Sequence, residues 1–193
     1  HFQGCPSWSN IIGGLIIYLN LFIFMFYFEI GDNMRTVLLT SIILLILGAL
    51  DDVIELGIIF RLIAQFACCL IVIGSGLLIT HIGDYMMMPK LEIGIFSIIF
   101  TIFCVIGLTN SFNFIDGVDG LCASLALISV VFILIISLLD KSYIYLIEFE
   151  YLILFSIILI LFIFFNINNR FKIFLGDAGS MFLGFFISWL LIM

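Results

Sequence analysis

The stretch SIILLILGALDDVIEL, residues 41–56, joins an uninterrupted apolar run to two adjacent aspartates, Asp51 and Asp52. A carboxylate near the bilayer centre costs about 3 kcal/mol or more, so an acid beside an apolar span is expected to serve a function or to meet a partner. Two later stretches repeat the arrangement: NSFNFIDGVDGL carries Asp116 and Asp119, and FKIFLGDAGS carries Asp177. Five carboxylates placed in this way predict a site for a divalent cation and a phosphorylated substrate.

The whole chain is too apolar for a soluble domain. Of its 193 residues 65% are hydrophobic and only 10% are charged, whereas soluble domains are roughly 45–50% apolar. A helix crosses a bilayer with about 20 mainly apolar residues. Seven segments qualify, at about 11–28, 36–50, 59–80, 93–110, 119–139, 147–165 and 175–193. The second and fourth are short, so we expect them to extend into the polar residues that follow.

These features predict an all-α, polytopic membrane protein with about seven transmembrane helices. Because no linker, repeat or polar domain interrupts the sequence, residues 1–193 are expected to form a single integral membrane domain in the lipid bilayer. The net charge of −7 argues against a nucleic-acid partner, which would require basic patches.

Successive spans reverse direction, so the loops between them alternate between the two sides of the bilayer. The loops near 51–60, 110–118 and 166–176 therefore share one side, and all three acidic motifs lie on them or on the adjoining helix ends. We predict that the motifs converge on one face. Lysine and arginine divide equally between the two sides, so the positive-inside rule does not orient the chain.

The first motif, GALDDVIEL (residues 48–56), places two carboxylates at the C-terminal end of a helix, where the helix dipole disfavours acids. Adjacent carboxylates also repel each other unless a cation is near. The alternative is a solvated helix end assisted by Arg61.

The second motif, residues 110–121, repeats polar side chains every three positions, at Asn110, Asn113, Asp116 and Asp119. Residues three apart share a face of helical backbone, so we expect one polar stripe that leads out of the membrane. Gly117 and Gly120 lie beside it and allow a ligand to approach the backbone closely. The alternative is an ordinary loop rich in glycine and asparagine.

The third motif, residues 171–180, opens the last helix with Asp177, as an N-cap or a first-turn residue. A simple Asp cap is one reading; a metal ligand beside phosphates at a helix N-terminus is the other. Lys172 either meets phosphate charge or anchors the chain at the interface. Because all candidate ligands across the motifs are oxygens, the expected cofactor is Mg²⁺, with Mn²⁺ as a second possibility.

In this order, GALDDVIEL, NSFNFIDGVDGL and FKIFLGDAGSMFLGF resemble the polyprenyl-phosphate N-acetylhexosamine-1-phosphate transferases (glycosyltransferase family 4). The third motif is most similar to the branch that primes O-antigen, enterobacterial common antigen or teichoic-acid linkage synthesis. The resemblance implies transfer of a sugar 1-phosphate, commonly GlcNAc-1-phosphate, from a UDP-sugar to undecaprenyl phosphate, with release of UMP. It also implies the bacterial inner membrane, an active site that faces the cytoplasm, and Mg²⁺ at the pyrophosphate. A homodimer is compatible with it.

Residue by residue, the resemblance implies that Asp177 is the principal metal ligand and Asn113 a second one. Asp51 and Asp52 match the essential acidic pair, and Asp116 and Asp119 match residues near the nucleotide and the metal. Asn110, Gly117 and Lys172 complete the expected UDP-sugar and cofactor contacts.

The sequence also departs from the family pattern. Family members have one or more spans before this region and several after it, including a loop with a histidine-rich motif. At the start, Gly13-Gly14 matches a family pair, but the lysine that precedes it in the family has no counterpart. We therefore expect a fragment that is inactive alone, within a parent transferase.

Several functional alternatives stay open at this stage. Within the reaction, direct attack by the lipid phosphate, with Asp52 orienting the acceptor and Asp51 supporting it, competes with an aspartyl covalent intermediate. Another donor is UDP-MurNAc-pentapeptide, as in the peptidoglycan enzyme. A cation transporter would place its acids near mid-membrane, where this sequence is plain hydrocarbon, and a non-catalytic membrane remnant is the structural alternative.

Overall fold

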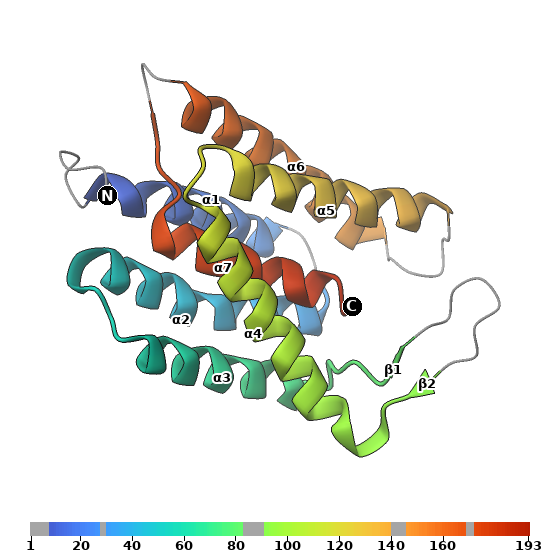
Figure 1. Cartoon of the computed structure of the whole chain (residues 1–193). Coiled ribbons are helices and arrows are strands. Elements are labelled where there is room, and N and C mark those ends of the chain that lie inside the picture. Colours follow the sequence, from blue (N-terminus) through green and yellow to red (C-terminus); the bar gives the residue numbers. More distant parts are fainter. Residues whose placement is uncertain (1–7, 28–29, 83–90, 140–145, 169–171) are drawn as a thin grey trace.

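A computed structural model describes residues 8–27, 30–82, 91–139, 146–168 and 172–193. Within these ranges the chain forms seven α-helices, as predicted, together with one short hairpin and one 3₁₀ turn (Figure 1). The helices are α1 (Trp8–Tyr27), α2 (Asp32–Ile54), α3 (Ile58–Gly74), α4 (Ser97–Ile115), α5 (Leu121–Leu139), α6 (Leu146–Ile167) and α7 (Gly176–Leu190). The strands β1 (His81–Ile82) and β2 (Leu91–Glu92) pair antiparallel, and the 3₁₀ turn covers Gly94–Phe96.

Four of the described helical segments are long and apolar enough to cross a membrane: Asp32–Ile54, Gly94–Ile115, Leu121–Leu139 and Phe149–Ile167. Ile12–Tyr27 and Ile58–Gly74 are shorter apolar helices. As expected, the second and fourth helices extend beyond their apolar runs and end at Ile54 and Ile115. The first acidic pair therefore lies in the last turn of α2.

The helix α7 lies at the centre of the bundle (Figure 1) and packs against α1, α2, α4 and α5. Every residue from Ala178 to Leu190 is buried. A helix that is apolar on all sides is stable only when neighbours cover all of its faces. The remaining helices thus hold α7, and with it the third motif, in a fixed place.

Glycines allow α7 to approach its neighbours closely. A Cβ atom on Gly48 of α2 would lie 2.5 Å from the Cα of Ala178, and one on Gly14 of α1 would lie 2.4 Å from the Cα of Gly179. Small residues at helix contacts bring backbones together in membrane proteins. These contacts fix the N-terminal turn of α7 against α1 and α2.

The three acidic motifs lie at one end of the bundle, as the alternation of loops predicted. The α2–α3 turn, the α4–α5 turn and the start of α7 are together at that end, and the β1–β2 hairpin is at the other (Figure 1). Hydrogen bonds link the motifs directly, as described below.

Candidate active site

Asp52 accepts hydrogen bonds from the start of α7. Its Oδ1 accepts the backbone N–H of Asp177 at 3.2 Å, and its Oδ2 accepts that of Ala178 at 3.4 Å. The first N–H groups of a helix have no partner within the helix and attract negative charge. Leu175, at the N-cap position of α7, makes no capping bond with its side chain. Asp52, from another helix, therefore caps α7.

Asp51 has a different role, in the turn between α2 and α3. Its Oδ1 accepts the N–H of Leu56 at 2.6 Å, and its Oδ2 accepts a hydrogen bond from the Arg61 guanidinium at 2.5 Å. The Asp51 side chain is only 4% exposed. Arg61 contacts Asp51, as the alternative of a solvated helix end supposed, but this alternative is wrong for Asp51, because the ion pair is largely removed from water.

Asn113 joins the second motif to the third. Its Nδ2 donates to the Asp177 Oδ1 at 2.7 Å and to the Ser180 Oγ at 3.0 Å. Asp177 lies in the first turn of α7, as predicted, directly after Gly176. Gly176 has φ +68°, a conformation that glycine adopts without strain and that lets the chain turn sharply into the helix.

Asp116 follows the last residue of α4 and faces the same place. The backbone N–H of Gly176 bonds to its carboxylate. Burial, together with the nearby charges of Asp177, Asp52 and Asp119, raises the pKa of the Asp116 carboxyl to about 8. Several carboxylates therefore share one partly buried volume, which is unfavourable without a neutralising cation.

Asp119 and Lys172 form an ion pair of 2.6 Å at the outer edge of this cluster. The Lys172 Nζ also lies 4.9 Å from the centre of the Phe174 ring. The side chain of Asp119 is 48% exposed and that of Lys172 is 21% exposed, so the pair borders solvent. An aromatic ring beside paired charges is a suitable surface for a planar polar ligand.

The second motif does not form the single continuous stripe that its spacing predicted. The helix ends at Ile115, and residues 116–120 turn through Gly120 with φ +73°. Asn110 bonds to Gln65 of α3, Asn113 to α7, and Asp119 to Lys172. Gly117 is exposed and close to no other element, as a position open to a ligand would be.

A family model described as "Glycosyl transferase family 4" matches residues 34–193 of the chain. This range contains all three acidic motifs, five of the seven helices in full, and α2 except for its first two residues. The chain belongs to glycosyl transferase family 4.

Curated bacterial relatives agree with this family. A probable undecaprenyl-phosphate N-acetylglucosaminyl 1-phosphate transferase of Bacillus subtilis is 28% identical over 92% of this chain and 49% of its own length. Undecaprenyl-phosphate alpha-N-acetylglucosaminyl 1-phosphate transferases of Escherichia coli K12 and Yersinia pestis are 30% and 28% identical, over 94% of this chain and 50% of theirs. The chain therefore spans about half the length of these relatives. Together with the apolar helices, they indicate a membrane protein.

Two buried amide side chains of this family 4 chain were not predicted from the sequence to support the site. Gln65 is 1% exposed and Asn166 is 5% exposed. The Oδ1 of Asn166 accepts the N–H of Gly120 at 2.5 Å, and its Nδ2 donates to the carbonyl of Ile173 at 2.7 Å. Asn166 thus ties the second motif to the segment before the third. A lone amide inside an apolar span was the available signal, because it must find a partner there.

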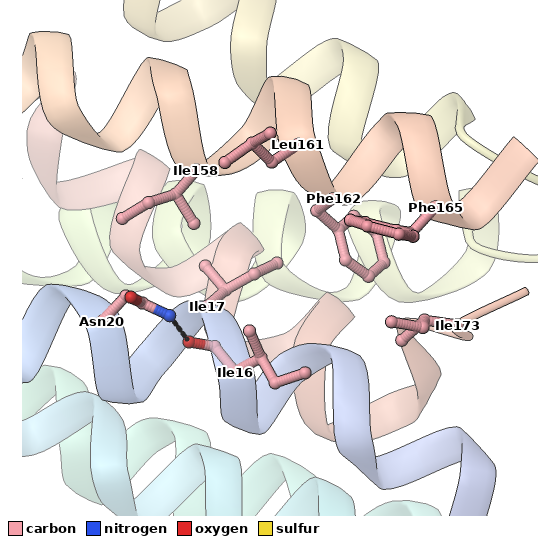
Figure 2. A pocket seen from close by; sticks show the side chains of 8 residues that line it. All are labelled: Ile16, Ile17, Asn20, Ile158, Leu161, Phe162, Phe165 and Ile173. Carbon is pink, nitrogen blue, oxygen red and sulfur yellow. Dashed lines mark hydrogen bonds between the residues drawn. The ribbon is translucent and has the colours of Figure 1, made fainter. Parts of the chain in front are cut away.

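An apolar groove of about 220 Å³ lies between α1 and α6 (Figure 2). Its one polar lining residue is Asn20, whose Nδ2 donates to the carbonyl of Ile16 at 2.7 Å. The rest of the lining is Ile16, Ile17, Ile158, Leu161, Phe162, Phe165 and Ile173. None of these side chains carries transfer chemistry, so the acidic cluster is the candidate site of this family 4 protein.

Proposed function

We propose that the protein transfers N-acetylhexosamine 1-phosphate, most simply GlcNAc-1-phosphate, from a UDP-sugar to undecaprenyl phosphate and releases UMP. This reaction would initiate synthesis of a cell-envelope polysaccharide. Family membership and the activities for which the bacterial relatives are named support it. The observation that carries it is the group formed by Asp52, Asn113 and Asp177, in which each motif contributes one hydrogen-bonded side chain.

We further propose that Asp177 and Asn113 hold Mg²⁺. Their oxygens are hard ligands, and Mg²⁺ commonly takes one or two carboxylates and completes its coordination with waters and substrate phosphates. Among the described residues no three His, Cys, Asp or Glu side chains form a ready metal cage. The raised pKa of Asp116 supports a need for positive charge here. When bound, the ion would neutralise charge on the pyrophosphate.

The acceptor needs little activation. A phosphate monoester has its second pKa at about 6, so the lipid phosphate is largely dianionic at neutral pH. Its oxygen would attack the β-phosphorus in line as the bond to the UMP oxygen breaks. Asp52 would keep the α7 N-terminus, and so Asp177, in place, while the Asp119–Lys172 edge and Phe174 would receive the nucleotide.

Direct attack is favoured over an aspartyl intermediate by the contacts of the acidic pair. A carboxylate oxygen that accepts one hydrogen bond keeps a second acceptor site, but each such bond lowers its nucleophilicity. Both oxygens of Asp51 accept bonds from Leu56 and Arg61, and both of Asp52 accept backbone N–H groups of α7. A phosphosugar adduct trapped on either aspartate would overturn this preference.

We also propose that the motif end of the bundle faces the cytoplasm in the bacterial inner membrane. The donor is a soluble nucleotide sugar, so the acidic cluster must be accessible from the compartment that contains it. The helix boundaries support only a common side for the three motifs; the choice of side rests on the proposed donor.

The deciding experiment measures Mg²⁺-dependent UMP release with undecaprenyl phosphate in detergent, using the protein as its gene encodes it. UDP-GlcNAc, UDP-GalNAc and UDP-MurNAc-pentapeptide are compared as donors. We expect release from UDP-GlcNAc that is lost in Asp177→Asn and after chelation of Mg²⁺. Release from UDP-MurNAc-pentapeptide alone would assign the peptidoglycan reaction instead, and release from no donor would refute a transferase of this class.

A further inference from the structure

The helix α3 contributes no residue to the expected metal or substrate contacts, yet two of its polar side chains contact two motifs. Arg61 bonds to Asp51 of the first motif, and Gln65 bonds to Asn110 of the second. Residues four apart lie on the same face of a helix. One face of α3 therefore links the first and second motifs from outside the acidic cluster.

The contact between Gln65 and Asn110 is a reciprocal amide pair. The Asn110 Nδ2 donates to the Gln65 Oε1 at 2.8 Å, and the Gln65 Nε2 donates back to the Asn110 Oδ1 at 3.5 Å. The same Nδ2 also donates to the carbonyl of Ile106, one turn earlier, at 2.8 Å. Because each amide supplies both a donor and an acceptor, the pair fixes the orientation of the Asn110 side chain.

Burial makes this pair hard to replace. Gln65 is 1% exposed, and an amide in an apolar environment is costly unless it is hydrogen-bonded. Asn110 is one helical turn before Asn113, which donates to Asp177. A contact that fixes Asn110 against α3 therefore also fixes the end of α4 that presents Asn113 to α7.

We propose that Gln65 is a positioning residue for the phosphosugar transfer, acting through Asn110. This inference rests on the proposed function. It assigns a role to a side chain that is not itself among the expected metal or substrate contacts, and it predicts that the amide group of Gln65, rather than the volume of its side chain, is what matters.

Gln65→Met tests the amide separately from packing, because methionine has a similar length and suits an apolar span. We expect kcat for UMP release to fall about tenfold, as the loss of one buried hydrogen-bonded contact allows, while the donor KM changes less than about twofold. Thr109→Val is the matched control. Thr109 is buried next to Asn110, and among the described residues its hydroxyl bonds only within α4, to Val105. We expect its kcat to equal that of the wild type.

A double-mutant cycle separates positioning from a general loss of stability. If Gln65 acts through Asn110, Gln65→Met should have no further effect on kcat in an Asn110→Ala background, and exchanging the two residues (Gln65→Asn with Asn110→Gln) should restore part of the loss. Additive effects, or a Gln65→Met protein that melts earlier but keeps its kcat, would overturn the role. Those results, with an active wild type, would leave the proposed function intact. A wild type inactive with every donor would refute both.

Discussion

Asp52 caps the first turn of α7, which has no capping side chain of its own. A substitution at this single residue tests the cap. Asp52→Ala removes both acceptors for the N–H groups of Asp177 and Ala178. Loss of a cap costs about 1–2 kcal/mol, so we expect a lower free energy of unfolding together with nearly complete loss of transfer.

Asp52→Asn is the informative companion, because its amide oxygen still accepts one N–H. We expect it to retain most of the stability while kcat stays reduced, since the charge at the helix N-terminus is gone. Both variants are compared by thermal unfolding and by UMP release. Wild-type activity in Asp52→Ala would contradict a role for this cap in the site.

The proposed role of Asp177 as a metal ligand predicts a measurable loss of metal affinity when this residue is replaced. Removing the side chain of a group that only supports a metal ligand already costs about 10- to 100-fold in affinity or activity, so Asp177→Asn should weaken Mn²⁺ binding by at least about 100-fold. Electron paramagnetic resonance of free Mn²⁺ measures this without turnover. Asp32→Asn is the control, because Asp32 is exposed in the first turn of α2. Unchanged Mn²⁺ affinity in Asp177→Asn would refute the ligand assignment.

At the scale of single residues, the sequence predicted which side chains belong to the site better than it predicted which residues they contact. The glycines around Asp177 and the apolar run that follows it in the sequence predicted its position in a first helical turn. That Asp52 would cap this turn could not be predicted, because the two residues are 125 positions apart and the contact depends on how α2 packs on α7. The partner of Gln65 could not be predicted for the same reason, because it is on another helix.

At the scale of helices, the tight contact between α2 and α7 predicts a specific sensitivity. A Cβ on Gly48 would lie 2.5 Å from the Asp177 carbonyl oxygen and from the Cα of Ala178, closer than atoms can pack. Gly48→Ala should therefore displace the first turn of α7. We expect lower thermal stability and a loss of transfer of at least about tenfold, since small displacements of reacting groups are costly.

Gly107→Ala is the matched control for this substitution. Gly107 lies within α4, and a Cβ there would meet nothing within 4 Å. Alanine forms helices better than glycine by about 1 kcal/mol, so the variant should be as stable as the wild type or more stable. Equal behaviour of the two variants would show that the close approach of α2 to α7 is unimportant.

Helix positions were predictable because long apolar runs have few alternatives in a bilayer. The burial of α7 was not predictable in the same way. Its run is less apolar than that of α5, yet α7 is buried from Ala178 to Leu190 while α5 exposes much of its surface. The sequence difference lies in the small residues at its contacts, such as Gly14, Gly48 and Gly179, which indicate close packing only once the partner helices are known.

At the scale of the whole molecule, the arrangement of the helices fixes which loops share a side, and the charges do not fix which side that is. The positive residues are evenly divided, so orientation depends on the proposed cytoplasmic donor. Single cysteines test it, introduced into a protein whose native cysteines, five of them within residues 1–193, are replaced by alanine. Val118 in the α4–α5 turn is 60% exposed, and Leu91 in the hairpin is 66% exposed.

A membrane-impermeant maleimide applied to intact cells should label Leu91→Cys and leave Val118→Cys unlabelled until the membrane is opened. This result is expected because α4 separates the two positions and the UDP-sugar is available only inside the cell. Labelling of both positions from outside would refute the helix arrangement itself. Labelling of Val118→Cys alone would agree with the helix arrangement but show the opposite orientation in the membrane. The acidic cluster would then face away from the compartment that contains the UDP-sugar, and the proposed transfer would be refuted.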